Sequence, residues 1–107
     1  INNIPEKTDL CICRDVLFHL ENIYVLEVLK NIKKSGTKYF ITTNFLDIKK
    51  NNKLNYYGVA ANKGWGFRKI NLNIEPFNLK RKLITCMLEP KCTWQGNYKR
   101  YICLYKF

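Results

Sequence analysis

The order of apolar and polar positions predicts strands alternating with one helix in the first half of the chain. Residues 9–14 are almost continuously apolar up to an Arg-Asp pair, which is typical of a parallel strand covered on both faces. Apolar side chains then recur at i, i+3, i+4 and i+7 across residues 22–34, which predicts an amphipathic helix. Residues 38–45 are β-branched and aromatic, so they predict a second strand. Together these elements form a βαβ unit with two parallel strands.

Residues at both ends of the helix support its limits. Asn22 suits the N-cap position, because its side chain accepts a hydrogen bond from the first helical turn. Lys33 and Lys34 suit the negative end of the helix dipole, and Gly36 suits the left-handed position that ends many helices.

The second half of the chain predicts a long connection followed by a hairpin. Residues 46–69 are rich in Asn and Lys, and a loop of this length is usually functional or disordered. A segment that turns at Pro76 follows. Residues 82–90 and 100–107 are strand-like and joined by a short turn, which predicts an antiparallel pair. The predicted fold class is therefore α/β, with two parallel strands joined by a helix and a C-terminal antiparallel hairpin.

Charge changes this picture only in part. The chain has 107 residues, and its 19 Lys and Arg against 8 Asp and Glu give a formal charge of +11. Such an excess attracts anionic partners, including nucleic acid. An AT-rich coding sequence would also produce the joint excess of Lys, Asn and Ile, and we favour that explanation over a dedicated polyanion site.

The cysteines and apolar runs indicate the kind of environment. Cys11 and Cys13 fall on one face of the first strand, where they would act as small buried hydrophobic residues. A C-x-C pair is a weak zinc signal, and His19 is too far away to complete a zinc knuckle, so we predict no metal. We expect reduced thiols and a cytoplasmic location. No apolar run approaches the length of a membrane span, so no membrane partner is predicted.

Polar side chains gather where the two parallel strands are predicted to end. Ligands of open α/β sheets bind outside the carboxyl ends of such strands. The residues at this edge are Cys13, Arg14, Asp15, His19, Thr43 and Asn44. A purely structural explanation stays open: Asp15 would cap a turn, Arg14 would pair with it, and His19 would be partly buried between apolar neighbours.

Three segments together resemble class I S-adenosylmethionine-dependent methyltransferases. They are "DLCICRDVLFHL", "SGTKYFITTNF" and "GWGFRKINLNIEPFNL", and with the final hairpin the resemblance covers essentially the whole chain. It implies strands four to seven of a Rossmann-like sheet, the seventh running antiparallel. The family's Gly-rich turn and its ribose-binding acidic residue are absent. Residues 1–107 are therefore expected to be the C-terminal portion of one such domain, without its N-terminal cofactor-binding half and with the first strand as an exposed edge.

The resemblance also implies roles for individual residues. Cys13, Arg14 and Asp15 would line the junction between S-adenosylmethionine and the methyl acceptor. Asp15 would orient or deprotonate the acceptor, and Arg14 would hold an anionic group. His19 is a candidate general base. Methyl transfer needs mainly alignment, however, so we favour a positioning role for His19.

The acceptor pocket is expected to draw on the segment after the second strand. Its candidates are Trp65 for stacking, Arg68 for a carboxylate or phosphate, and Asn71, together with Asn44 at the strand end. The alternative is structural: Trp65 packs under the loop, Arg68 pairs with Glu75, and Asn71 caps a turn. The acceptor's chemical class and the oligomeric state are not predicted.

Two other interpretations remain. In the first, the basic stretch "KKNNKLNYYGVAANKGWGFRK" belongs to a non-enzymatic fragment that binds nucleic acid through its lysines and aromatic rings. In the second, the chain is a catalytically inactive remnant of a methyltransferase.

Overall fold

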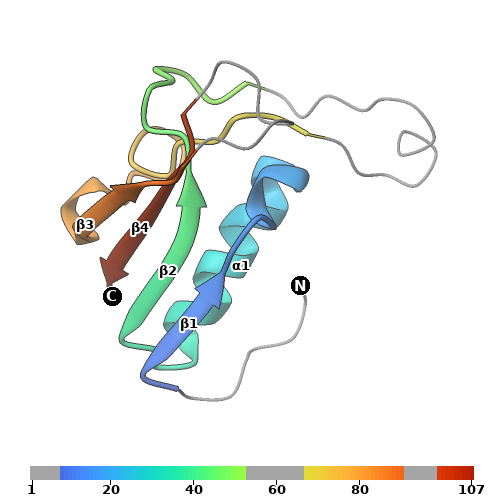
Figure 1. The fold of residues 1–107 in the computed structure, drawn as a ribbon. Coiled ribbons are helices and arrows are strands. Elements are labelled where there is room, and N and C mark those ends of the chain that lie inside the picture. Colours follow the sequence, from blue (N-terminus) through green and yellow to red (C-terminus); the bar gives the residue numbers. More distant parts are fainter. Residues whose placement is uncertain (1–7, 53–66, 91–98) are drawn as a thin grey trace.

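The structure of the protein is a computed structural model that describes residues 8–52, 67–90 and 99–107. Within these ranges it is a small α/β domain with one four-stranded mixed sheet and one α-helix (Figure 1). The elements are β1 (Leu10–Cys13), α1 (Asn22–Lys34), β2 (Tyr39–Asn44), β3 (Leu83–Leu88) and β4 (Tyr101–Lys106). Two short 3-10 helices, Leu17–His19 and Lys80–Lys82, lie in the connections. Each strand and the α-helix lie where the hydrophobic pattern predicted them, within two residues at either end.

The sheet order is β1-β2-β4-β3. The parallel pairing of β1 with β2 and the antiparallel pairing of β3 with β4 were both predicted and are confirmed. The position of β4 was not predicted: it lies between β2 and β3 and runs antiparallel to both. As a result, β1, β2 and β3 all end at the edge of the sheet where β4 begins. β1 is an outer strand among the described residues, as expected.

Helix α1 forms because one of its faces can be buried against the sheet. Val25, Leu29 and Ile32 are its buried residues, and their spacing is that of a helix face. Gly36 has a φ of 80°, which ends the helix as predicted. The predicted N-cap is wrong by one residue, since the cap is Glu21. The side chain of Asn22 instead binds a distant segment, because its Oδ1 accepts a hydrogen bond from Nη1 of Arg68.

The core lies between α1 and the face of the sheet that carries Phe40, Cys103 and Tyr105. The 3-10 turn before α1 and the segment before β3 extend this core toward the carboxyl ends of β1 and β2. Their buried residues are Leu17, Phe18, Ile70, Leu72, Phe77 and Leu79. Figure 1 shows the connections after β2 and before β3 gathered at this end of the sheet. Phe77, which follows the turn at Pro76, is among these core residues.

The opposite face of the sheet is open, so the expectation that β1 is covered on both faces is wrong. Ile12 is 63% exposed and Met87 of β3 is 65% exposed. In the register of the sheet, Ile12 pairs with Ile41, which pairs with Leu104. The one α-helix in the described ranges packs on the other face, which leaves Ile12 exposed and Ile41 and Leu104 half-buried.

Two further findings concern the cysteines and the helix. Cys11, Cys13, Cys86 and Cys103 form no disulfides. The fifth cysteine, Cys92, lies outside the described residues. No helix in the described ranges has the length and apolar character needed to cross a membrane.

Candidate functional site

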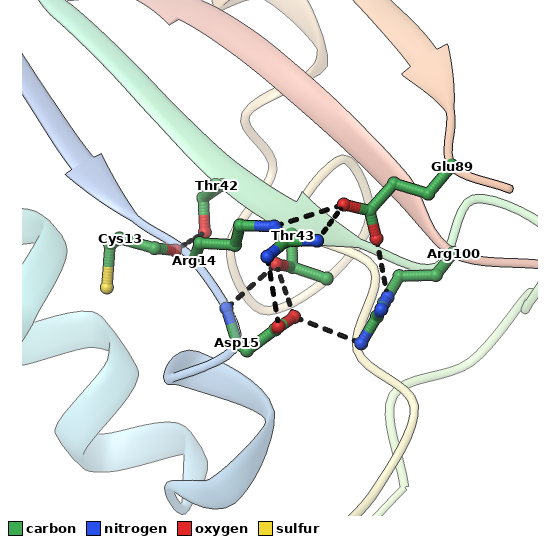
Figure 2. A network of polar contacts seen from close by, with 7 residues as sticks. All are labelled: Cys13, Arg14, Asp15, Thr42, Thr43, Glu89 and Arg100. Carbon is green, nitrogen blue, oxygen red and sulfur yellow. Dashed lines mark hydrogen bonds and ion pairs between the residues drawn. The ribbon is translucent and has the colours of Figure 1, made fainter. Parts of the chain in front are cut away.

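The carboxyl ends of the parallel strands carry a closed ring of four charged side chains (Figure 2). Arg14 and Asp15 follow β1, Glu89 follows β3, and Arg100 precedes β4. These positions meet because β4 is inserted between β2 and β3, which brings both ends of the hairpin connection to the edge where β1 stops. We call Arg14, Asp15, Glu89 and Arg100 the ionic ring.

Each member of the ionic ring contacts two members of opposite charge. Nε and Nη2 of Arg14 donate to Oε1 of Glu89 at 3.0 and 2.5 Å. Nε of Arg100 donates to Oε2 of Glu89 at 2.6 Å, and its Nη1 donates to Oδ1 of Asp15 at 3.2 Å. The ring closes between Nη1 of Arg14 and Oδ2 of Asp15, which are 3.8 Å apart. The expected structural pairing of Arg14 with Asp15 is therefore present, as one of four contacts.

The ionic ring has a buried half and an accessible half. The side chains of Arg100 and Glu89 are 3% and 9% exposed, whereas those of Arg14 and Asp15 are 55% and 33% exposed. Buried charges are tolerated when they are paired and hydrogen-bonded, as Arg100 and Glu89 are. The accessible half presents a guanidinium and a carboxylate side by side, which suits a ligand that carries both signs of charge.

The backbone of Asp15 is held in an uncommon conformation. Its φ of 57° lies in the left-handed region, which costs energy for a residue with a Cβ atom. Two hydrogen bonds to β2 hold it there: its N donates to Oγ1 of Thr43 at 2.9 Å, and that hydroxyl donates to Oδ1 of Asp15 at 3.1 Å. These contacts fix the direction of the carboxylate relative to β2. Backbone strain of this kind is concentrated at functional sites.

Cys13 is the last residue of β1 and lies beside the ring, but its thiol has low reactivity. Oγ1 of Thr42 donates to the carbonyl oxygen of Cys13 at 2.9 Å, and Figure 2 shows the thiol pointing away from the four charges. Burial raises the pKa of the Cys13 thiol to about 11, and the neighbouring Cys11 adds to that shift. Because a thiolate is the reactive form, Cys13 is a poor nucleophile at neutral pH.

His19 lies in a cluster of aromatic rings. Its ring meets Phe18 edge-on, with centroids 4.5 Å apart, and Phe67 at 6.3 Å. Phe18 also contacts Phe45, which follows β2. These contacts agree with the structural alternative, in which His19 is partly buried between apolar neighbours. Its positioning role and its role as a general base both stay predictions.

Asn44 is a fully buried hub at the end of β2. Its Nδ2 donates to the hydroxyl of Tyr105 at 2.8 Å, and its Oδ1 accepts from the backbone N of Leu72 at 2.8 Å. The Tyr105 hydroxyl in turn donates to Oδ1 of Asn73 at 2.7 Å. Asn44 thus ties the segment before β3 to the sheet, and its predicted contact with substrate stays a prediction.

Asn71 organises the same segment. Its Nδ2 donates to the carbonyl of Ile48 at 3.1 Å, and its Oδ1 accepts from the backbone N of Asn73 at 3.0 Å. The second bond is the turn cap that the structural alternative expected. Asn51 completes the connection, because its Oδ1 accepts from the backbone N of Asn71 at 2.8 Å. The high asparagine content, which coding bias could explain, therefore includes side chains that make specific hydrogen bonds: Asn44, Asn51 and Asn71.

Arg68 is buried and serves as a clamp. Its Nη2 donates to the carbonyl of Leu20 and its Nη1 to the carbonyl of Asn52, both at 2.9 Å, in addition to the bond with Asn22. The alternative pairing with Glu75 is therefore not the arrangement found. Burial lowers the pKa of Arg68, and the carboxylate of Glu21 partly opposes that shift. Trp65, the stacking candidate, lies outside the described residues.

Two members of the ionic ring were not predicted from the sequence. Glu89 and Arg100 fall within the predicted strands at residues 82–90 and 100–107, and the sequence predicts no contact of either with Asp15. The signal that could have found them was a charged residue at each inner end of the hairpin, next to Pro90 and Lys99. In the described ranges, no group of three His, Cys, Asp or Glu residues is placed to hold a metal ion.

Comparisons with known proteins assign no family or function to the chain. No protein-family model, no curated protein and no solved structure matches the chain.

Proposed function

We propose that the chain is part of an S-adenosylmethionine-dependent methyltransferase and forms the C-terminal portion of its Rossmann-like sheet. The resemblance of the sequence implied two parallel strands joined by a helix and a final strand running antiparallel to them, and β1, α1, β2 and β4 have this arrangement. The observation that carries the proposal is the fixed carboxylate of Asp15 at the carboxyl end of β1, where open α/β sheets bind ligands.

The described residues fit the methionine part of the proposed cofactor. That part carries an ammonium and a carboxylate, and the accessible half of the ionic ring offers Asp15 for the first and Arg14 for the second. When bound, the cofactor supplies a methyl group on a positively charged sulfonium. The protein then has to align donor and acceptor and to exclude water, because an in-line displacement depends mainly on geometry.

In this proposal, the other candidate residues orient the ligand or the segments around it and transfer no proton. Asp15 accepts a hydrogen bond from the ligand or the acceptor, and Thr43 holds its carboxylate in place. His19 forms part of the aromatic wall near this edge. Asn44 and Asn71 hold the connections that border it. The high pKa of Cys13 argues against that thiol as a methyl acceptor at neutral pH.

The acceptor is of unknown class, and we propose a cytoplasmic location. Four described cysteines without disulfides are consistent with that location, because thiols stay reduced there.

Calorimetry with S-adenosylmethionine tests the proposal, using both this chain and the product of its complete reading frame. We expect the complete product to bind, and Asp15→Asn to weaken binding by about tenfold, the loss of one charge-assisted contact. Asp9→Asn is the matched control, since Asp9 precedes β1 as Asp15 follows it and is exposed. Absence of binding by the complete product, or equal losses in the two variants, would refute the proposal.

A further inference from the structure

A basic pocket lies apart from the ionic ring, between the connection after β2 and the start of the segment before β3. Its volume is about 570 Å³. The residues that line it include Lys49, Lys50, Asn52, Phe67, Arg68 and Lys69. Ile48 completes the described lining, in which no acidic residue takes part. We call this hollow the basic pocket.

The charges of the basic pocket divide into a scaffold and a contact surface. Arg68 is the scaffold: it is 4% exposed, and its hydrogen bonds fasten the pocket wall at Asn52 to the residues that open α1. Its Nε is buried and has no hydrogen-bond partner within the described ranges. Lys49, Lys50 and Lys69 are exposed, so their ammonium groups are the ones that can reach a ligand.

The surroundings of the basic pocket also favour an anion. Lys49 and Lys50 line a neighbouring hollow of about 490 Å³ together with Asn22, the first residue of α1. The N-terminal end of a helix carries partial positive charge, which adds to that of the lysines. One carboxylate, that of Glu75, lies in the neighbouring hollow. The two hollows share Lys49 and Lys50, so an extended ligand in either hollow would contact these two side chains.

A second basic hollow serves as a contrast. It has a volume of about 420 Å³ and is lined in part by Lys33, Lys38 and Lys82. It lies at the C-terminal end of α1, where the helix dipole disfavours anions. Nζ of Lys33 also lies 5.4 Å from the centre of the Phe107 ring, within the range of a cation–π contact.

We infer that the basic pocket binds the phosphate backbone of single-stranded nucleic acid through Lys49, Lys50 and Lys69. Lysine ammoniums are compact charges that follow a flexible backbone without demanding one geometry. The pocket is open to solvent and borders a second hollow with which it shares Lys49 and Lys50, which suits an extended strand rather than an enclosed small molecule. The half-buried ring of Phe67 adds an apolar wall of the kind on which bases rest. This binding does not depend on methyl transfer.

Fluorescence anisotropy with a labelled thymidine oligonucleotide of about 12 nucleotides tests the inference. The test variant is Lys49→Gln/Lys50→Gln/Lys69→Gln. The matched control, Lys33→Gln/Lys38→Gln/Lys82→Gln, removes the same charge from the hollow at the other end of α1. We expect the test variant to bind about tenfold more weakly at low salt, and the slope of log affinity against log salt to become shallower by about 2. The control should retain both within about twofold, since it leaves the contacts in place.

Three results would overturn the inference. One is no binding of the oligonucleotide by the native chain at about 50 mM salt, where phosphate contacts are strong. Another is an equal loss in the test and control variants, which would mean attraction by net charge alone. The third is equal or tighter binding of a labelled oligoglutamate peptide of similar length, which would indicate an acidic protein partner. A preference for the oligonucleotide supports the inference.

Discussion

The ionic ring and the basic pocket both concentrate charge, but the charge is accessible to an anionic ligand mainly in the second. In the ionic ring, two guanidiniums and two carboxylates neutralise one another, and half of the ring is buried. In the basic pocket, all described lining charges have the same sign and three of the four side chains are exposed. The net charge of +11 therefore says little about function until each cation is assigned to its surroundings.

The largest predicted effect comes from breaking the ionic ring at its buried side. Arg100→Leu removes the buried 2.6 Å partner of Glu89 and leaves Arg14, whose side chain is 55% exposed, as its partner in the ring. Removing one member of a buried ion pair is costly. We expect the free energy of unfolding to fall by about 3–5 kcal/mol, measured by urea denaturation.

Arg14→Leu is the control for that measurement, because it removes the same charge from the accessible half of the ring. Its expected cost is about 1 kcal/mol or less, since exposed ion pairs contribute little. If the two variants were equally stable, the division into a buried and an accessible half would be wrong.

An effect of intermediate size is expected for the pH dependence of the free energy of unfolding. It comes from the buried thiols of β1 and β4. Burial raises the pKa of Cys13 to about 11 and that of Cys103 to about 12, from an ordinary value of 9.0. The folded chain thus keeps these protons after the unfolded chain has released them. The resulting stability is complete below pH 9 and is lost as the pH rises toward 11 and 12.

The corresponding measurement is the free energy of unfolding between pH 9 and 11, for the native chain and for Cys13→Ala. Each thiol should contribute a slope of about 1.4 kcal/mol per pH unit. We expect the decline to be shallower by about that amount in Cys13→Ala. An unchanged slope would show that Cys13 is not protected by burial.

The smallest predicted effect is that of substitutions in the basic pocket on the free energy of unfolding of the chain. Lys49→Gln/Lys50→Gln/Lys69→Gln removes three exposed cations, and surface substitutions of this kind change stability by about 0.5 kcal/mol or less. Relief of like-charge repulsion would make the change slightly stabilising. Urea denaturation of this variant also shows whether a loss of oligonucleotide binding reflects the pocket itself. A loss of stability above about 1 kcal/mol would mean that these lysines belong to the scaffold.

Local patterns were sufficient to predict most of the fold. The spacing of Val25, Leu29 and Ile32 and the left-handed Gly36 placed α1 correctly, because these signals act within a few turns of one helix. The pairing of the two final strands followed from their short connection. The insertion of β4 between β2 and β3 was not predicted, since it depends on contacts between segments far apart in the chain.

The same distinction applies to the candidate site. Arg14 and Asp15 were identified because they directly follow an apolar strand, which is a local signal. Glu89 and Arg100 were missed, because their contacts with the residues after β1 exist only once β4 occupies its place in the sheet. The sequence predicts a ligand contact or an ion pair with Glu75 for Arg68, whereas its hydrogen bonds join it to segments that become neighbours only in the folded chain.

The ionic ring also has a consequence for the order of events in folding. Arg14 and Glu89 are 75 positions apart in the chain, and Asp15 and Arg100 are 85 apart. Contacts of such long range carry a large loop-closure cost, so we expect the ring to close late in folding. Breaking it should then accelerate unfolding and leave the refolding rate almost unchanged. If unfolding rates measured by stopped flow rise in this way, the ring prolongs the lifetime of the folded state.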